Sequence, residues 1–139
     1  MMIEERSAGT VLFRETPSGN LYLLLNYPSG HWDFVKGNIE KGETLRETVI
    51  REIKEETGIN DVSFVDGFED KVEYHYQRNG KAVHKEVVFF LAKTNTTNVK
   101  ISHEHLGFIW LGYDDALRKL TYKNAQNVMK KVKNLSFNT

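Results

Sequence analysis

The segment GNIEKGETLRETVIREIKEETGI, residues 37–59, constrains the fold of this chain more than any other stretch. Thr44 and Glu47 have the spacing of a helix capping box, and Gly58 stands where a left-handed C-terminal cap is expected. These signals predict a helix over residues 44–57, about 20 Å long at about 1.5 Å per residue. Both ends of this helix are thus indicated by local sequence.

The predicted helix is acidic on one side. At about 100° per residue, Glu52, Glu55 and Glu56 fall within an arc of about 100°. Like charges this close oppose folding slightly, and carboxylates beside a packed face have raised pKa values unless a cation keeps them ionised. The adjoining arc carries the apolar side chains that we expect to pack on a sheet: Val49, Ile50 and Ile53.

Two interpretations of this acidic cluster are open on spacing alone. The first is a solvated face, since Glu47 and Glu55 each stand four residues from Arg51, a spacing worth about 0.2–0.5 kcal/mol per pair. The second is a metal site, because Glu52 and Glu56 stand four residues apart with no basic residue at a favourable helical spacing. Carboxylate oxygens without cysteine suit a hard divalent ion, Mg²⁺ or Mn²⁺.

Composition excludes several classes of protein. The chain has 139 residues and no cysteine, which excludes disulfides, thiolate catalysis and thiolate zinc sites and is compatible with a reducing cytosol. Its 19 acidic and 19 basic residues balance, so bulk charge does not indicate binding to long nucleic acid. The stretch MMIEERSAG lacks the apolar core of a secretory signal, and apolar runs such as VVFFLA are too short to span a bilayer. We expect one domain over residues 1–139, cytoplasmic, monomeric and without a membrane partner.

The rest of the chain has the pattern of strands around a few helices. AGTVLFRE and LYLLLNY predict two strands joined by a turn at TPSGN. VSFVDGFED predicts a further strand, and KVEYHYQRNGKAVHKEVVFFLAKT predicts a hairpin about RNGK. HLGFIWLG predicts one more strand, while YDDALRKL and YKNAQNVMKKV predict a short helix and a C-terminal helix. This order predicts a mixed α/β domain.

The full string of the acidic segment resembles the Nudix box. Gly37 is followed by five residues, then Glu43, seven residues and REIKEETGI, so every fixed position of the pattern is matched. Nudix proteins are typically hydrolases of a nucleoside diphosphate linked to another group, and they hold magnesium on a loop–helix–loop. The resemblance therefore implies the Nudix fold, an α/β/α sandwich with a mixed curved sheet.

The same resemblance implies roles for the residues of the box. Cleavage of a phosphoanhydride needs charge neutralisation on the phosphate oxygens and an activated water, and bound divalent ions provide both. Arg51 is expected to orient the acidic side chains. The implied metal ligands are Glu52, Glu55 and Glu56, with Glu43 as a supporting carboxylate, and the implied loop residues are Gly37 and Gly58.

Outside the box, the chain is similar to the asymmetrical diadenosine tetraphosphate hydrolases, especially the animal-type branch. The matching pieces are LLLNYPSGHWDFVKGNIEKGE, GFEDKVEY, VVFFLAK, ISHEHLGFIWLGYDDAL and TYKNA. This similarity implies that Glu104 of SHEH assists the metal or the water, and it favours Glu56 or Glu104 over Glu43 as general base. Val35 departs from the pattern, because relatives often have proline there. The implied substrate contacts are His31, Lys36 and Lys85 to the phosphates, with Gly37 beside them, Tyr122 stacked on an adenine, and Tyr74 or Tyr76 as the second aromatic contact.

The expected reaction is hydrolysis of a dinucleoside polyphosphate, with diadenosine tetraphosphate cleaved to ATP and AMP. One alternative is pyrophosphate removal from a triphosphorylated RNA 5′ end, or action on another nucleoside diphosphate-linked substrate. Another is a Nudix-fold nucleotide-binding module without turnover. Lys36 and Lys85 would otherwise be surface lysines, and Tyr122 part of a helix core. His103 and His105 suggest zinc, but two histidines without an evident third ligand are weak support.

Overall fold

The computed structural model describes residues 2–136, and no helix in this range is long and apolar enough to cross a membrane. Strands stand before, between and around a few helices, as the sequence predicts. In chain order they are β1 (Ile3–Thr16), β2 (Gly19–Asn26), β3 (Trp32–Asp33), β4 (Val35–Asn38), α1 (Leu45–Thr57), β5 (Ser63–Arg78), β6 (Lys81–Lys93), β7 (Gly107–Leu111), α2 (Tyr113–Lys119) and α3 (Lys123–Ser136).

The strands form one mixed sheet with β1 at its centre. The hydrogen-bonded order is β3–β2–β1–β6–β5, while β4 pairs with β1 and β7 pairs with β2. β1 runs parallel to β6 and antiparallel to β2 and β4. Its first half pairs with β4 through residues 7–10, and its end pairs with β2 through residues 13–16. β1 therefore ties the segment that precedes α1 to the rest of the sheet.

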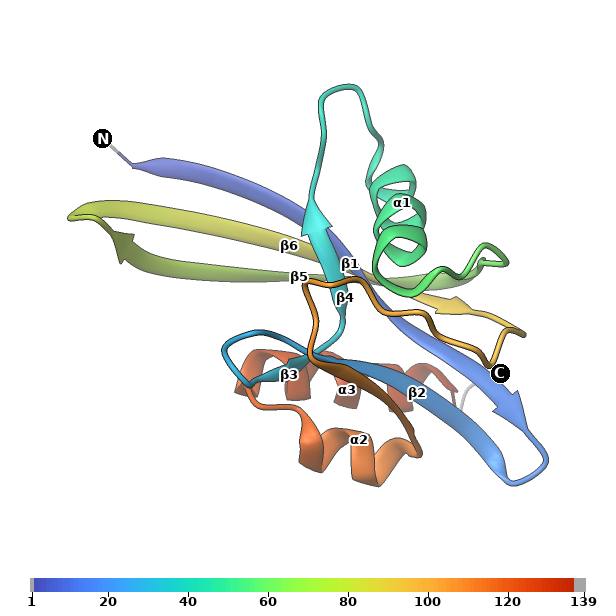
Figure 1. Cartoon of the computed structure of the whole chain (residues 1–139). Coiled ribbons are helices and arrows are strands. Elements are labelled where there is room, and N and C mark those ends of the chain that lie inside the picture. Colours follow the sequence, from blue (N-terminus) through green and yellow to red (C-terminus); the bar gives the residue numbers. More distant parts are fainter. Residues whose placement is uncertain (1, 137–139) are drawn as a thin grey trace.

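Side chains of the central strands alternate between two apolar cores, one on each face of the sheet. On β1, Val11 and Phe13 belong to one core and Leu12 to the other. On β6, Phe89 lies in the first core and Phe90 in the second. Helices α2 and α3 cover the first core and α1 covers the second (Figure 1). This arrangement confirms the predicted α/β/α sandwich, and it explains the nearly continuous apolar runs of strands that are buried on both faces.

Local signals determine both ends of α1. Thr44 Oγ1 accepts a hydrogen bond from Glu47 N at 3.1 Å, and Glu47 Oε1 accepts one from Thr44 N at 2.8 Å, which confirms the capping box. Because Glu47 is engaged at the cap, its expected pair with Arg51 does not form in the described structure. At the other end, Gly58 has φ 76° and its N–H donates to Lys54 O at 2.9 Å, which confirms the left-handed cap.

One expectation for the packed side of α1 is wrong. Ile53 is fully buried and Val49 nearly so, but Ile50 is 44% exposed. The buried arc of the helix extends instead to Thr48, Glu56 and Thr57. The centre of this arc lies close to Val49, so Ile50 points about 100° away from it at helical spacing.

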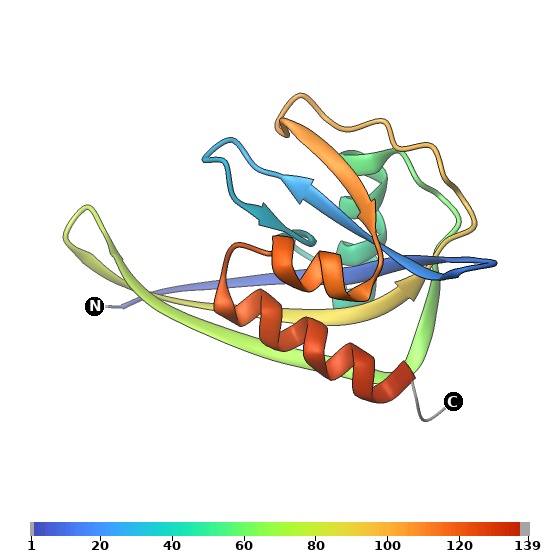
Figure 2. The same cartoon turned by 90° about the horizontal axis from the view of Figure 1, so that it is seen from below.

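β5 and β6 form a long hairpin whose outer end projects beyond the helices (Figures 1 and 2). Its turn contains Asn79 and Gly80 with φ 51° and 79°, so both have the positive φ that a type I′ turn requires, as RNGK predicts. The two strands predicted before this turn are one strand with a register shift between Phe64 and Glu69. β1 starts earlier than expected, because residues 3–7 pair with β6, a contact that no local signal indicates.

Candidate active site

Three adjoining cavities bring together most of the residues that the sequence singled out. The first has a volume of about 570 Å³ and the second about 460 Å³, and both are lined by Glu52, Glu56 and Glu104. The third, about 420 Å³, shares Lys36 with the second and is otherwise lined from β5 and the start of α3. Shared lining residues therefore connect the carboxylates of α1 to the cavity that Tyr74 and Tyr122 line.

Glu56 is the most buried of the four predicted metal ligands, with 5% of its surface exposed. Within residues 2–136, neither of its carboxylate oxygens has a hydrogen-bond partner. Burial, and after it the neighbouring carboxylate of Glu52, raises the pKa of Glu56 well above its ordinary value. A buried carboxylate without a partner is costly, so a cation beside Glu56 would stabilise its ionised form.

Arg51 donates hydrogen bonds to three glutamates. Its Nη1 donates to Glu52 Oε1 at 2.7 Å and to Glu55 Oε2 at 3.0 Å, and its Nε donates to Glu43 Oε2 at 2.7 Å. The hydrogen bond from Arg51, followed by one from the Glu40 N–H, lowers the pKa of Glu43 to about 2. These bonds restrict the rotamers of Glu52 and Glu55 and keep Glu43 ionised.

The four predicted metal ligands face one cavity, but their oxygens are spread within it. Glu104 reaches this cavity from the loop before β7, where the Ser102 N–H donates to Glu56 O at 3.2 Å. Within residues 2–136, no three of the four predicted ligands have oxygens that all lie within 4.8 Å of one another. Because Arg51 holds two of the carboxylates, side-chain rotation would be needed to gather them around one ion.

Gly37, on β4, lies directly against the carboxylate of Glu52. Its φ is outside the left-handed region, whereas a Cβ built on it would overlap the Glu52 carboxylate. Gly37 thus lies in a strand, and its backbone conformation does not require glycine. Glycine is needed there because a larger side chain would occupy the space of the Glu52 carboxylate. Gly58 does adopt the left-handed conformation expected of it.

The third cavity combines a cation with two aromatic rings. Lys36 Nζ lies 6.0 Å from the centroid of the Tyr74 ring and 3.0 Å from Asp33 Oδ2. Burial lowers the pKa of Lys36, but the charge and hydrogen bond of Asp33 outweigh it and the pKa is raised. Tyr122 lines the same cavity just before α3 and is 49% exposed. The cavity thus offers a charged amine beside an accessible ring.

His31 and Lys85 lie next to this cavity. The His31 ring stacks on Tyr27 with 4.8 Å between centroids, and it lies 5.1 Å from the ring of Tyr122. Lys85 is half-buried on β6, where burial and then the charge of Lys36 lower its pKa. Two lysines therefore lie near each other beside this cavity.

The two tyrosines that the sequence could not separate have different surroundings. Tyr74 lines the third cavity and is the cross-strand partner of Lys85. Tyr76 lies farther along the hairpin and lines none of the three cavities. Its hydroxyl donates to Glu5 Oε1 at 2.7 Å and accepts a hydrogen bond from Arg78 at 2.7 Å.

Two further residues beside Glu56 were not predicted as site residues. His105 is buried with Nε2 3.2 Å from Glu56 Oε1, out of hydrogen-bond alignment, and with Nδ1 3.1 Å from Ser102 Oγ. Its ring meets that of Tyr27 edge to face at 4.7 Å, and burial lowers its pKa. The SHEH motif could have indicated His105, whereas Tyr27, which directly follows β2, lies within a matching piece but carries no motif of its own.

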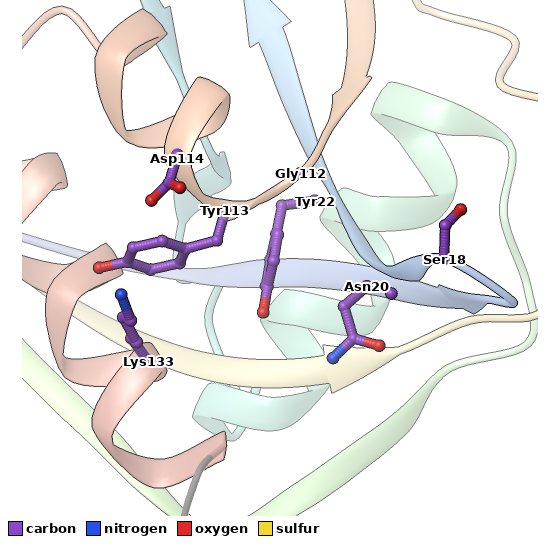
Figure 3. A pocket seen from close by; sticks show the side chains of 8 residues that line it. Ser18, Asn20, Tyr22, Gly112, Tyr113, Asp114 and Lys133 are labelled. Carbon is purple, nitrogen blue, oxygen red and sulfur yellow. The ribbon is translucent and has the colours of Figure 1, made fainter.

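A fourth cavity, of about 560 Å³, lies away from these groups, beside the turn between β1 and β2 (Figure 3). Tyr22 and Tyr113 meet edge to face inside it at 6.4 Å, and Lys133 Nζ lies 4.9 Å from the Tyr113 ring centroid. None of the predicted site residues lines it, and the buried unpaired polar atoms of the described structure lie elsewhere. Its lining residues are Ser18, Gly19, Asn20, Tyr22, Gly112, Tyr113, Asp114 and Lys133.

The combination of an acidic helix α1, a glycine on the strand before it and a mixed sheet is shared with a known protein family. Residues 4–132 match the model of the NUDIX domain. The chain belongs to the Nudix family. The fold is accordingly the Nudix fold, with its acidic helix packed on one face of the sheet.

Relatives of this Nudix protein match it over most of their length. The asymmetrical bis(5′-nucleosyl)-tetraphosphatase of Caenorhabditis elegans is 32% identical over 129 residues, which are 91% of this chain and 92% of that protein. The Mus musculus protein of the same name is 32% identical over 130 residues, 85% and 86% of the two chains. The structure of a C. elegans Ap4A hydrolase binary complex has a TM-score of 0.84 at 29% identity and covers 97% of this chain and 99% of that one. The E. coli dihydroneopterin triphosphate pyrophosphohydrolase shares the fold, with a TM-score of 0.74 at 18% identity and coverage of 93% and 96%.

The Nudix domain and these relatives identify the chain as a pyrophosphohydrolase. Nudix hydrolases generally need a divalent metal ion. The residues present fit such an ion, because the buried oxygens of Glu56 accept no hydrogen bond from the described residues and the carboxylates around them are the ligands that hard divalent ions prefer.

Proposed function

We propose that this Nudix hydrolase cleaves dinucleoside polyphosphates asymmetrically and converts diadenosine tetraphosphate to ATP and AMP. The observation that carries the proposal is the run of cavities from the carboxylates of α1, past Lys36, to Tyr74 and Tyr122. A polyphosphate that ends in a base meets acidic, cationic and aromatic groups in this order. Similarity to asymmetrical tetraphosphatases over most of both chains supports the same reaction.

In this proposal Glu52, Glu55, Glu56 and Glu104 hold the metal ion, Mg²⁺ or Mn²⁺. Such an ion, when bound, neutralises phosphate charge and lowers the pKa of a coordinated water. Arg51 limits the positions of the Glu52 and Glu55 carboxylates through its Nη1. Burial of Glu56 keeps bulk water away from its oxygens.

Glu56 and Glu104 are the candidates to accept the proton of the attacking water. The two oxygens of Glu56 accept no hydrogen bond from the described protein, so both are free to approach a water in the cavities that Glu56 lines. Glu104 lines the same cavities from the opposite loop. Glu43 is a poorer base, because Arg51 holds its pKa at about 2.

The remaining groups bind the substrate. Lys36 and Lys85 neutralise phosphates beyond the metal ligands, and His31 packs against the ring of Tyr122. Tyr122 stacks on one adenine. Tyr74, rather than the tyrosine two residues later, makes the second aromatic contact, because it shares the cavity with Lys36.

Product analysis over a panel of dinucleoside polyphosphates, with Mg²⁺ and oxygen-18 water, tests the proposal. We expect ATP and AMP from diadenosine tetraphosphate, and the label identifies the phosphorus that water attacks. Two molecules of ADP would contradict asymmetrical cleavage. A higher kcat/KM for triphosphorylated RNA would favour an RNA pyrophosphohydrolase, and nucleotide binding without product would favour a binding module.

A substitution at Glu56 tests the assignment of the site. Glu56→Gln should lower turnover about 10²- to 10⁴-fold, the usual range for a general base. Glu15→Gln is the matched control, because Glu15 is largely exposed and pairs with Lys93 away from the cavities. Near-normal turnover of Glu56→Gln with unchanged substrate binding would contradict the assignment.

A further inference from the structure

The outer end of the β5–β6 hairpin carries a second group of metal-binding side chains. His75 on β5 and His84 on β6 are cross-strand partners, and Glu4 on β1 is the partner of His84 on its other side. Glu73 lies two residues before His75 and therefore on the same face of the sheet. This row crosses three strands where the sheet projects beyond the helices (Figures 1 and 2).

This group lies on the opposite face of the hairpin from the substrate contacts. Side chains alternate along a strand, so His75 and His84 point away from Tyr74 and Lys85. Their face continues along β6 into the core beneath α1, which contains Val88. The group is therefore separate from the glutamate cavity and from the aromatic cavity.

The donor atoms of the group are close together. Glu73, His75 and His84 each contribute one ligand atom, and these three atoms all lie within 4.8 Å of one another. In the described part of the chain, no other three acidic or histidine side chains have ligand atoms this close together. Glu73 Oε2 lies 3.7 Å from His84 Nε2. The ring centroids of His75 and His84 are 4.7 Å apart, and the two ring planes are inclined by 20°. Ligand atoms around a tetrahedral Zn²⁺, with bonds of about 2.0–2.1 Å, are separated by about 3.3 Å. Small side-chain rotations would bring the three atoms to that spacing.

A second observation orients His84 for metal binding. Its Nδ1 lies 2.7 Å from Glu4 Oε2, in hydrogen-bond contact. A carboxylate that accepts this proton leaves the lone pair on Nε2, the nitrogen that faces Glu73. Metal-binding histidines in proteins have this arrangement of an outer carboxylate behind the ring. Lys71 Nζ lies 3.6 Å from Glu73 Oε1, whereas Oε2 is the Glu73 oxygen that lies near His84 Nε2.

We propose that Glu73, His75 and His84 bind a divalent transition-metal ion such as Zn²⁺, with Glu4 as the outer carboxylate that orients His84. Two imidazoles and one carboxylate are the ligands of a site with an open fourth position, which water fills. The mixed nitrogen and oxygen donors favour Zn²⁺ over Mg²⁺, in contrast to the all-carboxylate cavity. The ion would cross-link β5 and β6 behind the strand positions that carry Tyr74 and Lys85.

Zinc titration of the chelator-treated full chain tests the proposal, with isothermal calorimetry for stoichiometry and NMR for the histidine rings. Wild type should bind one more Zn²⁺ than the double variant His75→Ala/His84→Ala. The variant Glu52→Gln/Glu56→Gln should keep this equivalent, which separates it from any Zn²⁺ in the glutamate cavity. In wild type, the ring signals of His75 and His84 should shift in step with that equivalent.

Two carboxylate variants distinguish a built site from general charge attraction. Glu4→Gln should weaken this Zn²⁺ affinity about 10- to 100-fold, the usual effect of an outer partner. Glu86→Gln removes a charge opposite Glu73 without removing a ligand, and it should change the affinity less than about threefold. Circular dichroism confirms the fold of each variant, and His84→Gln replaces the double variant if that one does not fold. Equal zinc binding by wild type and the histidine variant, or equal losses in Glu86→Gln and Glu73→Gln, would overturn the proposal.

Discussion

At the scale of single residues, the candidate site depends on how closely side chains approach one another. Gly37 leaves the space that the Glu52 carboxylate occupies, and Arg51 donates a hydrogen bond to Oε1 of that carboxylate. His31 stacks on Tyr27 and also lies against Tyr122, so the exposed ring of Tyr122 packs on a side chain that is itself held in place. Small changes at such contacts should alter activity more than they alter stability.

Gly37→Ala is expected to disrupt the site and spare the fold. The added Cβ overlaps the far end of the flexible Glu52 side chain, so Glu52 must move while the backbone stays in place. A displacement of about 1 Å at a catalytic group costs on the order of 100-fold in rate, and we expect a loss of that order in kcat/KM. Gly107→Ala is the control, because no atom of the described residues that could clash lies within 4 Å of its added Cβ. Equal activity of both variants in a steady-state assay would contradict this account.

Tyr122→Ala should weaken substrate binding without changing the chemical step. Loss of one stacked base costs about 1–3 kcal/mol, which raises KM about 5- to 150-fold at an unchanged kcat. Tyr122→Phe keeps the ring and should behave like wild type, since stacking does not use the hydroxyl. A similar rise of KM in both variants would show that the hydroxyl, and not the ring, contacts the substrate.

Predictability from sequence differs sharply among these residues. Glu52, Glu55 and Glu56, which line one cavity, could be singled out from sequence because their spacing is local, although spacing alone left a solvated face and a metal site open. His105 and Tyr27 were missed as neighbours of Glu56, because only the packing of β2 and the loop before β7 brings them there. The need for glycine at position 37 was also not visible in the sequence, because it arises from the tertiary contact with Glu52 on the following helix.

At the scale of elements, the position of α1 depends on one apolar stripe and on tethers at its end. Ile53 packs into the core beneath the helix, whereas Ile50 points largely to solvent. After the helix, Asp61 accepts hydrogen bonds from Thr94 Oγ1 and the Asn95 N–H, both at 2.7 Å. The loop that leaves α1 is thereby joined to the segment that leaves β6.

A matched pair of isoleucine substitutions tests how α1 is packed. Ile53→Ala should lower the free energy of unfolding by about 2–5 kcal/mol, because it leaves a cavity in a closed core. Ile50→Ala should change it by less than about 1 kcal/mol, because that side chain is already partly in water. Urea unfolding followed by circular dichroism measures both values. Comparable losses would mean that the helix is rotated relative to this structure.

Asp61 gives stability a defined pH dependence. Hydrogen bonds from the Thr96 and Thr94 hydroxyls and the Asn95 N–H lower the pKa of Asp61 to about 2. The ionised form is favoured in the folded state, so this stabilisation is complete above the ordinary pKa of 3.8 and is lost as pH falls through about 2. Asp61→Ala should lose about 1 kcal/mol at neutral pH, a value reduced by solvent screening. Its stability should also fall less steeply than that of wild type between about pH 4 and pH 2.

Urea unfolding at several pH values measures this effect. Asp66→Ala is the control, because Asp66 is 98% exposed and its nearest cation, Arg46 Nη2, is 3.9 Å away. This control should follow the wild-type pH curve. If Asp61→Ala also follows it, the hydrogen bonds of Asp61 contribute no net stability.

At the scale of the whole molecule, two separate cores make the fold independent of the groups at the site. Val11 and Phe89 belong to the core under α2 and α3, and Leu12 and Phe90 to the core under α1. The mixed sheet between them was predictable as a class from the order of its strands and helices. The parallel pairing of β1 with β6 was not, because it joins segments about eighty residues apart without a local signal.

Removal of divalent ions should therefore abolish activity and leave the protein folded. Excess chelator is expected to reduce hydrolysis below detection, while circular dichroism and cooperative unfolding persist. Addition of Mg²⁺ should restore turnover and raise the melting temperature, because an ion that binds only the folded state stabilises it. Full hydrolysis in chelator would exclude the metal role of the glutamates, and unfolding in chelator would show that the cores depend on the ion.

The long hairpin also determines how this protein can change. Its two faces hold different chemistry in alternate positions, with Tyr74 and Lys85 on one side and His75 and His84 on the other. Deletion of a single residue from β5, between the register shift and the Asn79 turn, would exchange these sides beyond that point. Imidazole would then replace tyrosine beside Lys36. The hairpin should therefore tolerate substitutions, or insertions and deletions of an even number of residues in a strand. A change by an odd number would disrupt both faces of the hairpin at once.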